Sequence, residues 1–389
     1  MIKSFVKLSI KRIRKYYSIT VLSLFVACGS VSNPDVAVND LKANSGISTK
    51  QVDEIANVLR FYPNNTQLSI ALVSDRSVVF YGAIRENDSL KTISNSAVLF
   101  EIGSLTKVFT STILADLAWQ NKLRLDQPIN DYMGFSLNTE KNIIFKQLSN
   151  HTSGMPRIPS GFVWESLLHM DNPYKDYDEN KLRDYLKNEL ELQSETGAEF
   201  QYSNIGAGVL GYVLTKLENK SYEQLLQEKI SQLYGMSNST SKREQLQGPL
   251  ATGLSKWGNP TSYWDFGALQ GAGAILSTAD DLSKFIIANF DETNEALKLQ
   301  RESTFSISEN REIALGWLIL KQESGEQWYW HNGGTGGFRS SMVMNTELGT
   351  GIAVLSNISS GHSHAAKIDS LSYTLLESMK PKISDIIVN

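Results

Sequence analysis

Ser104 and Lys107 stand three residues apart in the run Ser-Leu-Thr-Lys, at the start of a predicted helix. Residues at this spacing share one face of a helix, with Cβ atoms about 5–6 Å apart, so the hydroxyl and the amine point to the same side. A serine hydroxyl is a weak nucleophile until a neighbouring group takes its proton, and a lysine can take it. The same spacing recurs at Ser4 and Ser239, but neither residue opens a helical pattern. Ser104 and Lys107 are therefore candidates for nucleophilic catalysis.

Tyr202 and Asn204, in the run Tyr-Ser-Asn, form a second candidate group. A phenol has an unperturbed pKa of about 10 and acts as a general base only where a cation stabilises its anion. Lys107 could supply that charge if the two segments meet. The amide of Asn204 offers both a donor and an acceptor for orienting a substrate or an amine. The alternative is a loop tyrosine packed in the core beside an asparagine that caps a helix.

A glycine-rich run begins at His331, directly after an aromatic strand pattern. Gly333 and Gly334 allow a ligand to approach the backbone, and exposed backbone N–H groups can bind an oxyanion. The run does not match the spacing Gly-x-Gly-x-x-Gly, so a dinucleotide-binding loop is not supported. The alternative is an ordinary glycine-rich turn between two strands.

Strand patterns lie near both ends of the chain, and helical patterns lie between them. The predicted strands are 68–73, 78–84, 313–320, 327–331, 340–344 and 351–355. The predicted helices are 108–118, 179–192, 210–217, 222–230, 279–290 and 370–379. Alternating strand–helix units are absent, which argues against Rossmann and barrel folds. We therefore predict an α+β fold, in which N- and C-terminal segments form one antiparallel sheet and the middle forms a helical insert.

Composition indicates a globular protein of one large domain or two coupled ones. The chain has 389 residues, of which 41% are hydrophobic and 20% are charged. Beyond residue 27 it carries 31 basic and 41 acidic residues, a net charge of −10, which makes nucleic acid a poor partner. The single cysteine, Cys28, excludes a disulfide framework and a cysteine-based metal site. His362 and His364 lack matched carboxylates and are interpreted as solvated loop residues, so we expect neither metal nor cofactor.

The N-terminal segment is typical of an export signal. Six basic and no acidic residues precede Tyr16, and the apolar run 16–28 is shorter than the roughly 20 residues that span a bilayer. The run ending at Cys28 resembles the lipobox of bacterial lipoproteins, although Phe25 replaces the usual leucine. The resemblance implies a signal over 1–28, a lipidated Cys28, a tether over 29–45, and a protein anchored in the periplasm or at the outer membrane. The alternative is an ordinary buried cysteine after a cleaved signal.

The three motifs together resemble the active-site set of the serine β-lactamase and penicillin-binding protein superfamily. The resemblance covers about residues 50–380 and is nearest to the branch of class C β-lactamases, D-alanyl-D-alanine carboxypeptidases and related esterases. Four further stretches resemble the family: 100–103, 123–129, 148–156 and 273–282. The resemblance implies an α/β sandwich plus an all-α insert. The domain would cover 46–385, with its sheet part at 46–110 and 300–385 and its helical part at 111–299.

The resemblance also implies a role for each motif residue. Ser104 would be the acylated nucleophile and Lys107 its proton partner. Tyr202 would return the proton to the leaving group, and Asn204 would hold both the substrate and Lys107. The backbone N–H groups of Ser104 and Gly334 would form the oxyanion hole. Which of Lys107 and Tyr202 is the acylation base stays open.

His331 departs from the class C pattern, which has Lys-Thr-Gly where this chain has His331, Asn332 and Gly333. A lysine there attracts the carboxylate of a β-lactam, whereas histidine is mostly neutral at pH 7. His331 and Gly333 would still line the substrate site, and a titrating His331 would give an inflection in activity near pH 6–7. We predict a monomeric hydrolase of amide or ester bonds in a β-lactam, a D-Ala-D-Ala-type peptide or a related small molecule. A short-chain esterase and a non-hydrolytic receptor for peptidoglycan fragments or β-lactams are the alternatives.

Overall fold

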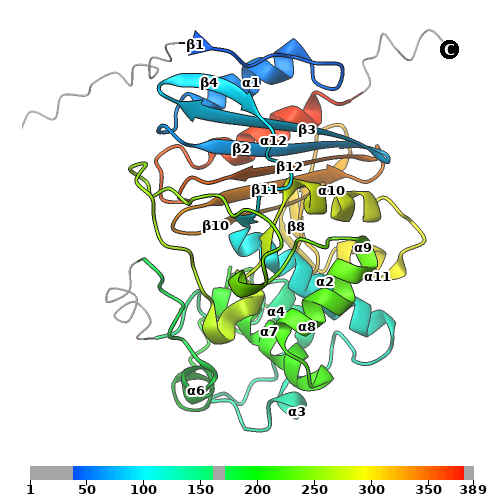
Figure 1. Ribbon diagram of the computed structural model, residues 1–389. Helices are drawn as coiled ribbons and strands as arrows, with labels where there is room; N and C mark the ends of the chain where they lie inside the picture. Colours follow the sequence, from blue (N-terminus) through cyan, green and yellow to red (C-terminus); the bar gives the residue numbers. More distant parts are fainter. Residues whose placement is uncertain (1–37, 161–170, 381–389) are drawn as a thin grey trace, which may run out of the picture. The chain divides into compact units, whose positions relative to one another are not determined.

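A computed structural model describes residues 38–160 and 171–380 of the chain. An antiparallel sheet forms one part of these residues, and a helical part lies beside it (Figure 1). The predicted α+β class is thereby confirmed. The predicted export signal and Cys28 lie outside the described residues. Within the described ranges, no helix is both long enough and apolar enough to span a bilayer.

The main sheet joins the two ends of the described chain. Its strands are β1 (Val38–Asn39), β2 (Gln67–Ser74), β3 (Ser77–Glu86), β4 (Ser89–Ile93), β7 (Phe305–Ser308), β8 (Arg311–Ile313), β9 (Leu318–Lys321), β10 (Gln327–Gly334), β11 (Arg339–Asn345) and β12 (Thr350–Ser356). Their order is β1-β4-β3-β2-β12-β11-β10-β9-β8-β7. All neighbours are antiparallel except β1 and β4. The pairing of β2 with β12 confirms the prediction that N- and C-terminal segments share one sheet.

Both faces of this sheet are covered, because alternate side chains of a strand point to opposite faces. Ile70 of β2 packs with α1 (Thr49–Leu59) and α12 (Lys367–Glu377) on one face. Its neighbour Ala71 belongs to the core on the other face, which includes α10 (Ala279–Ala288). The two faces therefore build two separate hydrophobic cores.

The helical part is centred on α2 (Thr106–Trp119), which follows the Ser104 turn. Its residues from Thr106 to Leu117 are all buried, so α2 is a core helix. The neighbouring helices are α3 (Asn130–Met133), α4 (Phe145–Ser149), α6 (Glu179–Asp184), α7 (Asn204–Glu218), α8 (Tyr222–Leu226), α9 (Gln232–Tyr234) and α11 (Glu295–Arg301). A helix buried all round gives its side chains fixed positions, which suits a scaffold for Lys107.

Two predicted strand boundaries are wrong near the site. The predicted strand 313–320 is two strands, β8 and β9, separated by a turn at Gly316 with φ +76°. A Cβ on Gly316 would lie 3.0 Å from the carbonyl oxygen of Lys107, so this turn packs directly on α2. The predicted strand 327–331 extends further, because β10 ends at Gly334, so Gly333 and Gly334 belong to the strand and not to the turn that was the alternative.

The predicted domain boundaries also need correction. Residues 38–45 do not belong to a tether, because β1 pairs with β4 and Leu41 is buried. The predicted helical part 111–299 contains α10, which packs on β2 and β12 of the sheet. It also contains β6 (Leu276–Ser277), which pairs with β5 (Phe100–Glu101) just before the Ser104 turn. The sheet part is therefore assembled from more than the two ends of the chain.

Candidate active site

Ser104 lies in a single 3₁₀ turn, Gly103–Leu105, between β5 and α2. This turn packs against the end of β10, and two glycines make the close approach feasible. A Cβ on Gly103, where φ is +51°, would lie 2.6 Å from the backbone nitrogen of Gly334. A Cβ on Gly333 would lie 1.8 Å from the carbonyl oxygen of Ile102. Gly333 is thus required by backbone packing, and the Gly334 nitrogen is held beside the Ser104 turn.

Lys107 lies one turn into the helix, with its amine directed at Ser104. Its Nζ donates to the Ser104 Oγ at 3.1 Å and to the Ala272 carbonyl oxygen at 2.7 Å. The side chain is buried, and burial, followed by the positive charge of Arg157, holds the pKa of Lys107 well below its usual range. A lowered pKa favours the free amine, which is the form of Lys107 that could accept the Ser104 proton.

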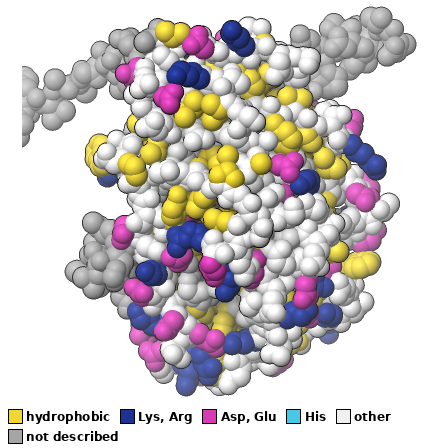
Figure 2. All heavy atoms as spheres, viewed as in Figure 1, with side chains coloured by type: hydrophobic (Ala, Val, Ile, Leu, Met, Phe, Trp, Pro, Cys, Tyr) yellow, Lys and Arg dark blue, Asp and Glu magenta, His cyan; other side chains and the backbone are white. Residues whose placement is uncertain are grey.

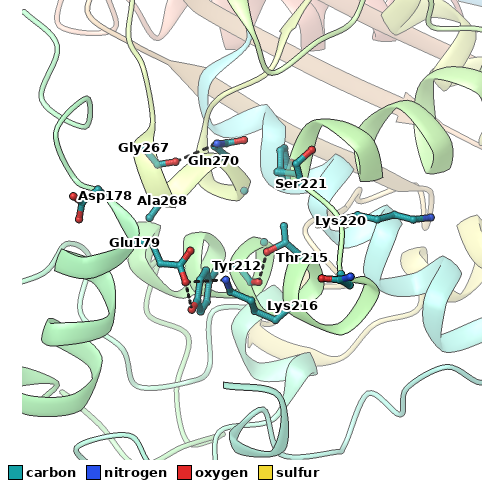
Figure 3. Close-up of a pocket in the computed structure, with 14 residues that line it drawn as sticks. Asp178, Glu179, Tyr212, Thr215, Lys216, Lys220, Ser221, Gly267, Ala268 and Gln270 are labelled. Atoms are coloured by element: carbon teal, nitrogen blue, oxygen red, sulfur yellow. Dashed lines mark hydrogen bonds and ion pairs between the residues drawn. The ribbon is translucent and has the colours of Figure 1, made fainter. Parts of the chain in front are cut away.

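The carbonyl that holds Lys107 is positioned by a contact between α7 and the segment 267–272. At this contact a Cβ on Gly211 would lie 2.9 Å from the Cα of Gly271, so only glycine allows the two backbones to meet. A cavity of about 540 Å³ opens on the outer side of this contact (Figure 3). Figure 3 shows Glu179 bound by both Tyr212 and Lys216 there, at 3.0 and 2.8 Å. None of the predicted site residues lines this cavity.

Tyr202 directly precedes Ser203, whose hydroxyl caps α7 by accepting the Gly206 N–H at 2.8 Å. This cap fixes the backbone next to Tyr202. The centroid of the Tyr202 ring lies 5.0 Å from Lys107 Nζ and 5.1 Å from Arg157 Cζ. Burial raises the pKa of Tyr202 to about 12, although the hydrogen bond to Ser104 and the charge of Arg157 lower it. The phenol is therefore protonated at neutral pH and better suited to donate than to accept a proton.

Asn204 is the first residue of α7, and its side chain does not make the expected contact with Lys107. Its Nδ2 donates to the Tyr174 hydroxyl at 3.2 Å, and its buried Oδ1 has no hydrogen-bond partner within the described ranges. The Lys107 amine is held by the Ala272 carbonyl instead. Asn204 does not line the cavity beside Ser104, so the structure does not bring its amide into contact with that cavity.

His331 lies in β10 and is buried. Its Nδ1 donates to the Asn332 carbonyl oxygen at 2.6 Å, which places the ring proton on Nδ1. Burial and the charge of Lys107 lower the pKa of His331 to about 3. The expected inflection near pH 6–7 can therefore not come from this residue.

Substitution of His331 by asparagine is expected to leave the shape of the pH profile of kcat/KM unchanged between pH 5 and 8. The reason is that His331 is neutral throughout this window, so it has no proton to gain or lose there. His364→Asn, at a histidine that does not line the site cavity, is the matched control. An inflection of the native protein that moves only in the His331 variant would contradict this expectation.

Four residues of the site were not predicted from the sequence: His151, Arg157, Arg339 and Ser360. The centroid of the His151 ring lies 4.5 Å from that of the Tyr202 ring. The Nδ1 of His151 accepts the Ser203 backbone N–H at 3.2 Å. The other three line a cavity of about 290 Å³ together with Ser104, Tyr202, Asn332, Gly333 and Gly334. The signal for Arg157 was present, because it directly follows the family-like stretch 148–156.

The histidine pair near the C-terminus does not form a metal centre. The rings of His362 and His364 lie 5.7 Å apart and pack beside Phe61 and Tyr62. Among residues 38–160 and 171–380, no group of three or more histidine, cysteine or acidic side chains is placed to hold a metal ion.

The serine turn, the lysine one turn later and the tyrosine before α7 define the class of the serine β-lactamase and penicillin-binding protein superfamily. The family model described as Beta-lactamase matches residues 66–372. The chain belongs to the beta-lactamase family.

The chain is also similar in sequence to several curated proteins. The chain is 28% identical to "Beta-lactamase-like protein 2" of Dictyostelium discoideum, over 71% of this chain and 52% of that protein. It is 25% identical to "Protein flp" of Staphylococcus aureus (strain MW2), over 75% of this chain and 59% of that protein. It is also 25% identical to "D-alanyl-D-alanine-carboxypeptidase/endopeptidase AmpH" of Escherichia coli (strain K12), over 78% of this chain and 82% of that protein. The chain thus spans little more than half the length of the first two of these relatives.

Solved structures share the fold. "Beta-Lactamase/D-Alanine Carboxypeptidase from Pseudomonas syringae" superposes with a TM-score of 0.71 at 21% identity, covering 86% of this chain and 99% of that one. "A class C beta-lactamase" superposes with a TM-score of 0.70 at 21% identity, covering 88% of this chain and 100% of that one. The predicted β-lactamase/transpeptidase-like fold and the superfamily resemblance are therefore confirmed.

Proposed function

We propose that the protein is a serine hydrolase that works through an acyl-Ser104 intermediate on amide or ester bonds. The observation that carries this proposal is the 3.1 Å contact between Lys107 Nζ and Ser104 Oγ, made by a buried lysine with a lowered pKa. A neutral amine at hydrogen-bond distance is what a serine needs to become a nucleophile. Family membership supports the same reaction class.

In the proposed acylation step, Ser104 Oγ attacks the carbonyl carbon and its proton passes to Lys107. The oxyanion is stabilised by the backbone N–H groups of Ser104 and Gly334. When the bond to the leaving group breaks, Tyr202 donates its proton to that group and recovers one from Lys107. This order follows from the raised pKa of Tyr202, which keeps the phenol protonated. Water then cleaves the acyl-Ser104 ester and restores the free serine.

A substrate panel tests this function on the purified full-length chain. The panel comprises a nitrophenyl ester, a D-Ala-D-Ala peptide and a chromogenic cephalosporin. We expect turnover of at least one of these three substrates, because each presents a carbonyl carbon that Ser104 Oγ can attack. Turnover of the ester alone would favour the short-chain esterase, and acylation without turnover would favour the receptor. Absence of both acylation and turnover with every substrate would contradict the proposal.

We also infer that the protein is exported and anchored through lipidated Cys28. The basic start, the short apolar run and the lipobox-like sequence support this inference. Loss of fatty-acid labelling in a Cys28→Ser variant tests the anchor, and unchanged labelling would contradict it.

A further inference from the structure

The cavity beside Ser104 contains one cation without a matching anion. Two guanidinium groups line this cavity, those of Arg157 and Arg339. Arg339 is ion-paired with Asp369, whose carboxylate also accepts a hydrogen bond from Asn332 at 3.0 Å. Arg157 is exposed and has no ion-pair partner among the residues that the structure describes. An unpaired arginine in a substrate cavity is a free anion-binding group.

The backbone that carries Arg157 is rigidly attached to the start of α7. The Arg157 carbonyl oxygen accepts the backbone N–H of Asn204 at 2.9 Å. The preceding carbonyl, that of Pro156, accepts the Ser203 hydroxyl at 2.6 Å. Because Tyr202 immediately precedes these residues, the same hydrogen bonds fix Arg157 relative to the catalytic phenol. The backbone of Arg157 is thus fixed beside the site, and its guanidinium lies over the Tyr202 ring, 5.1 Å from the centroid, although the residue is exposed.

The chemistry of arginine indicates what this position binds. A guanidinium presents its N–H groups as a planar fork that matches the two oxygens of a carboxylate. Residue 331, which is a lysine in class C enzymes, is here a buried histidine turned toward the Asn332 carbonyl. The strand β10 therefore supplies no cation from that position. Arg157 reaches the cavity from the segment that follows α4 instead.

We propose that Arg157 is the anion-recognition residue of this site and that the substrate carries a carboxylate close to the bond attacked by Ser104. The carboxylate binds the Arg157 guanidinium, while the reacting carbonyl lies between Ser104 and the Gly334 nitrogen. This inference rests on the proposed function, since it names the substrate class of the same site. It assigns specificity to a loop residue rather than to β10.

A matched pair of substrates tests the proposal on the full-length protein. Hippuryl thioglycolate and its methyl ester form the same acyl-enzyme and differ only in the carboxylate of the leaving group. Release of the thiol leaving group reports hydrolysis. The measured quantity is the ratio of kcat/KM for the acid to kcat/KM for the methyl ester. We expect Arg157→Gln to lower this ratio by about 10- to 100-fold, the size of a lost hydrogen bond to a charged group. Arg157→Lys restores part of the ratio, because it keeps the charge and loses the fork.

Arg76→Gln is the control, because Arg76 is an exposed arginine in the turn between β2 and β3, away from the cavity. We expect it to leave the ratio unchanged. Taking a ratio cancels any general effect of Arg157 on the reactivity of Ser104. An unchanged ratio in Arg157→Gln, with both substrates still hydrolysed, overturns the proposal while the serine hydrolase stands.

A binding measurement separates this proposal from the hydrolase proposal. In a Ser104→Ala background, which cannot be acylated at Ser104, calorimetry measures the Kd of hippuryl thioglycolate with Arg157 present or replaced by glutamine. We expect the replacement to weaken binding by about 10- to 100-fold. If the native protein neither hydrolyses nor is acylated by the panel substrates and the two thioesters, but this difference is found, the hydrolase proposal fails and anion recognition stands. If Arg157→Gln does not change the Kd, or nothing binds, anion recognition by Arg157 is refuted.

Discussion

Ser104→Ala is expected to lower kcat by about 10⁴-fold or more, because loss of the nucleophile removes the covalent pathway and leaves only binding and the oxyanion hole. The change removes a single hydroxyl from a partly buried side chain, so the fold should remain intact. Turnover of whichever panel substrate the native protein hydrolyses fastest is the measurement. Circular dichroism and thermal unfolding verify that the variant is folded.

Ser239→Ala is the matched control for this prediction. Ser239 opens the only other Ser-x-x-Lys run within the described residues, but its hydroxyl binds Asp281 and Ser277 at 2.9 and 2.8 Å, away from the site cavity. We expect it to cost about 1–3 kcal/mol of stability through the unpaired partners, with kcat unchanged. Equal turnover by Ser104→Ala and the native protein would refute the assignment of the nucleophile.

Lys107→Met is expected to lower kcat by about 10³-fold or more, because it removes the amine that accepts the Ser104 proton. Methionine has similar length and tolerates the buried environment, so the neighbouring packing is retained. Ser104 remains in place, which predicts slow acylation rather than none. A variant with native kcat would show that another group, such as Tyr202, is the base.

The same variant tests the lowered pKa of Lys107 through the pH dependence of stability. Between the folded pKa and about 10.4, the unfolded chain binds a proton at Lys107 that the folded chain does not, so Lys107 makes the free energy of unfolding rise with pH. Lys107→Met removes this contribution of Lys107 to the pH dependence of the free energy of unfolding. The free energy of unfolding of the native protein, minus that of the variant, should therefore increase with pH across this range. Lys256→Met, at an exposed lysine, should show no such increase.

The motifs and the element types near the catalytic residues could be predicted from the sequence. The strand patterns at 68–73 and 78–84 predicted two strands, and the structure has β2 and β3 there, paired with each other. The helical spacing after Ser104 predicted α2, but spacing alone did not reveal that the helix is buried on every side. The helix α1 was missed, although Ser48 and Gln51 form a capping box that marks its start.

Properties that depend on neighbours distant in sequence could not be predicted. The neutrality of His331 comes from burial in β10 and from the charge of Lys107, more than two hundred residues earlier. The place of Arg157 comes from hydrogen bonds between its backbone and α7. Asn204 donates to the Tyr174 hydroxyl, and the Ala272 carbonyl oxygen accepts from Lys107. Each of these is a consequence of how segments pack, which neither periodicity nor spacing encodes.

The most direct measurement for this account is the intact mass of the protein quenched during turnover of hippuryl thioglycolate, followed by peptide mapping. The account predicts a transient increase by the mass of one hippuryl group, located on the peptide that contains Ser104 and absent from Ser104→Ala. Hydrolysis without any adduct, or an adduct on a peptide that lacks Ser104, would contradict it.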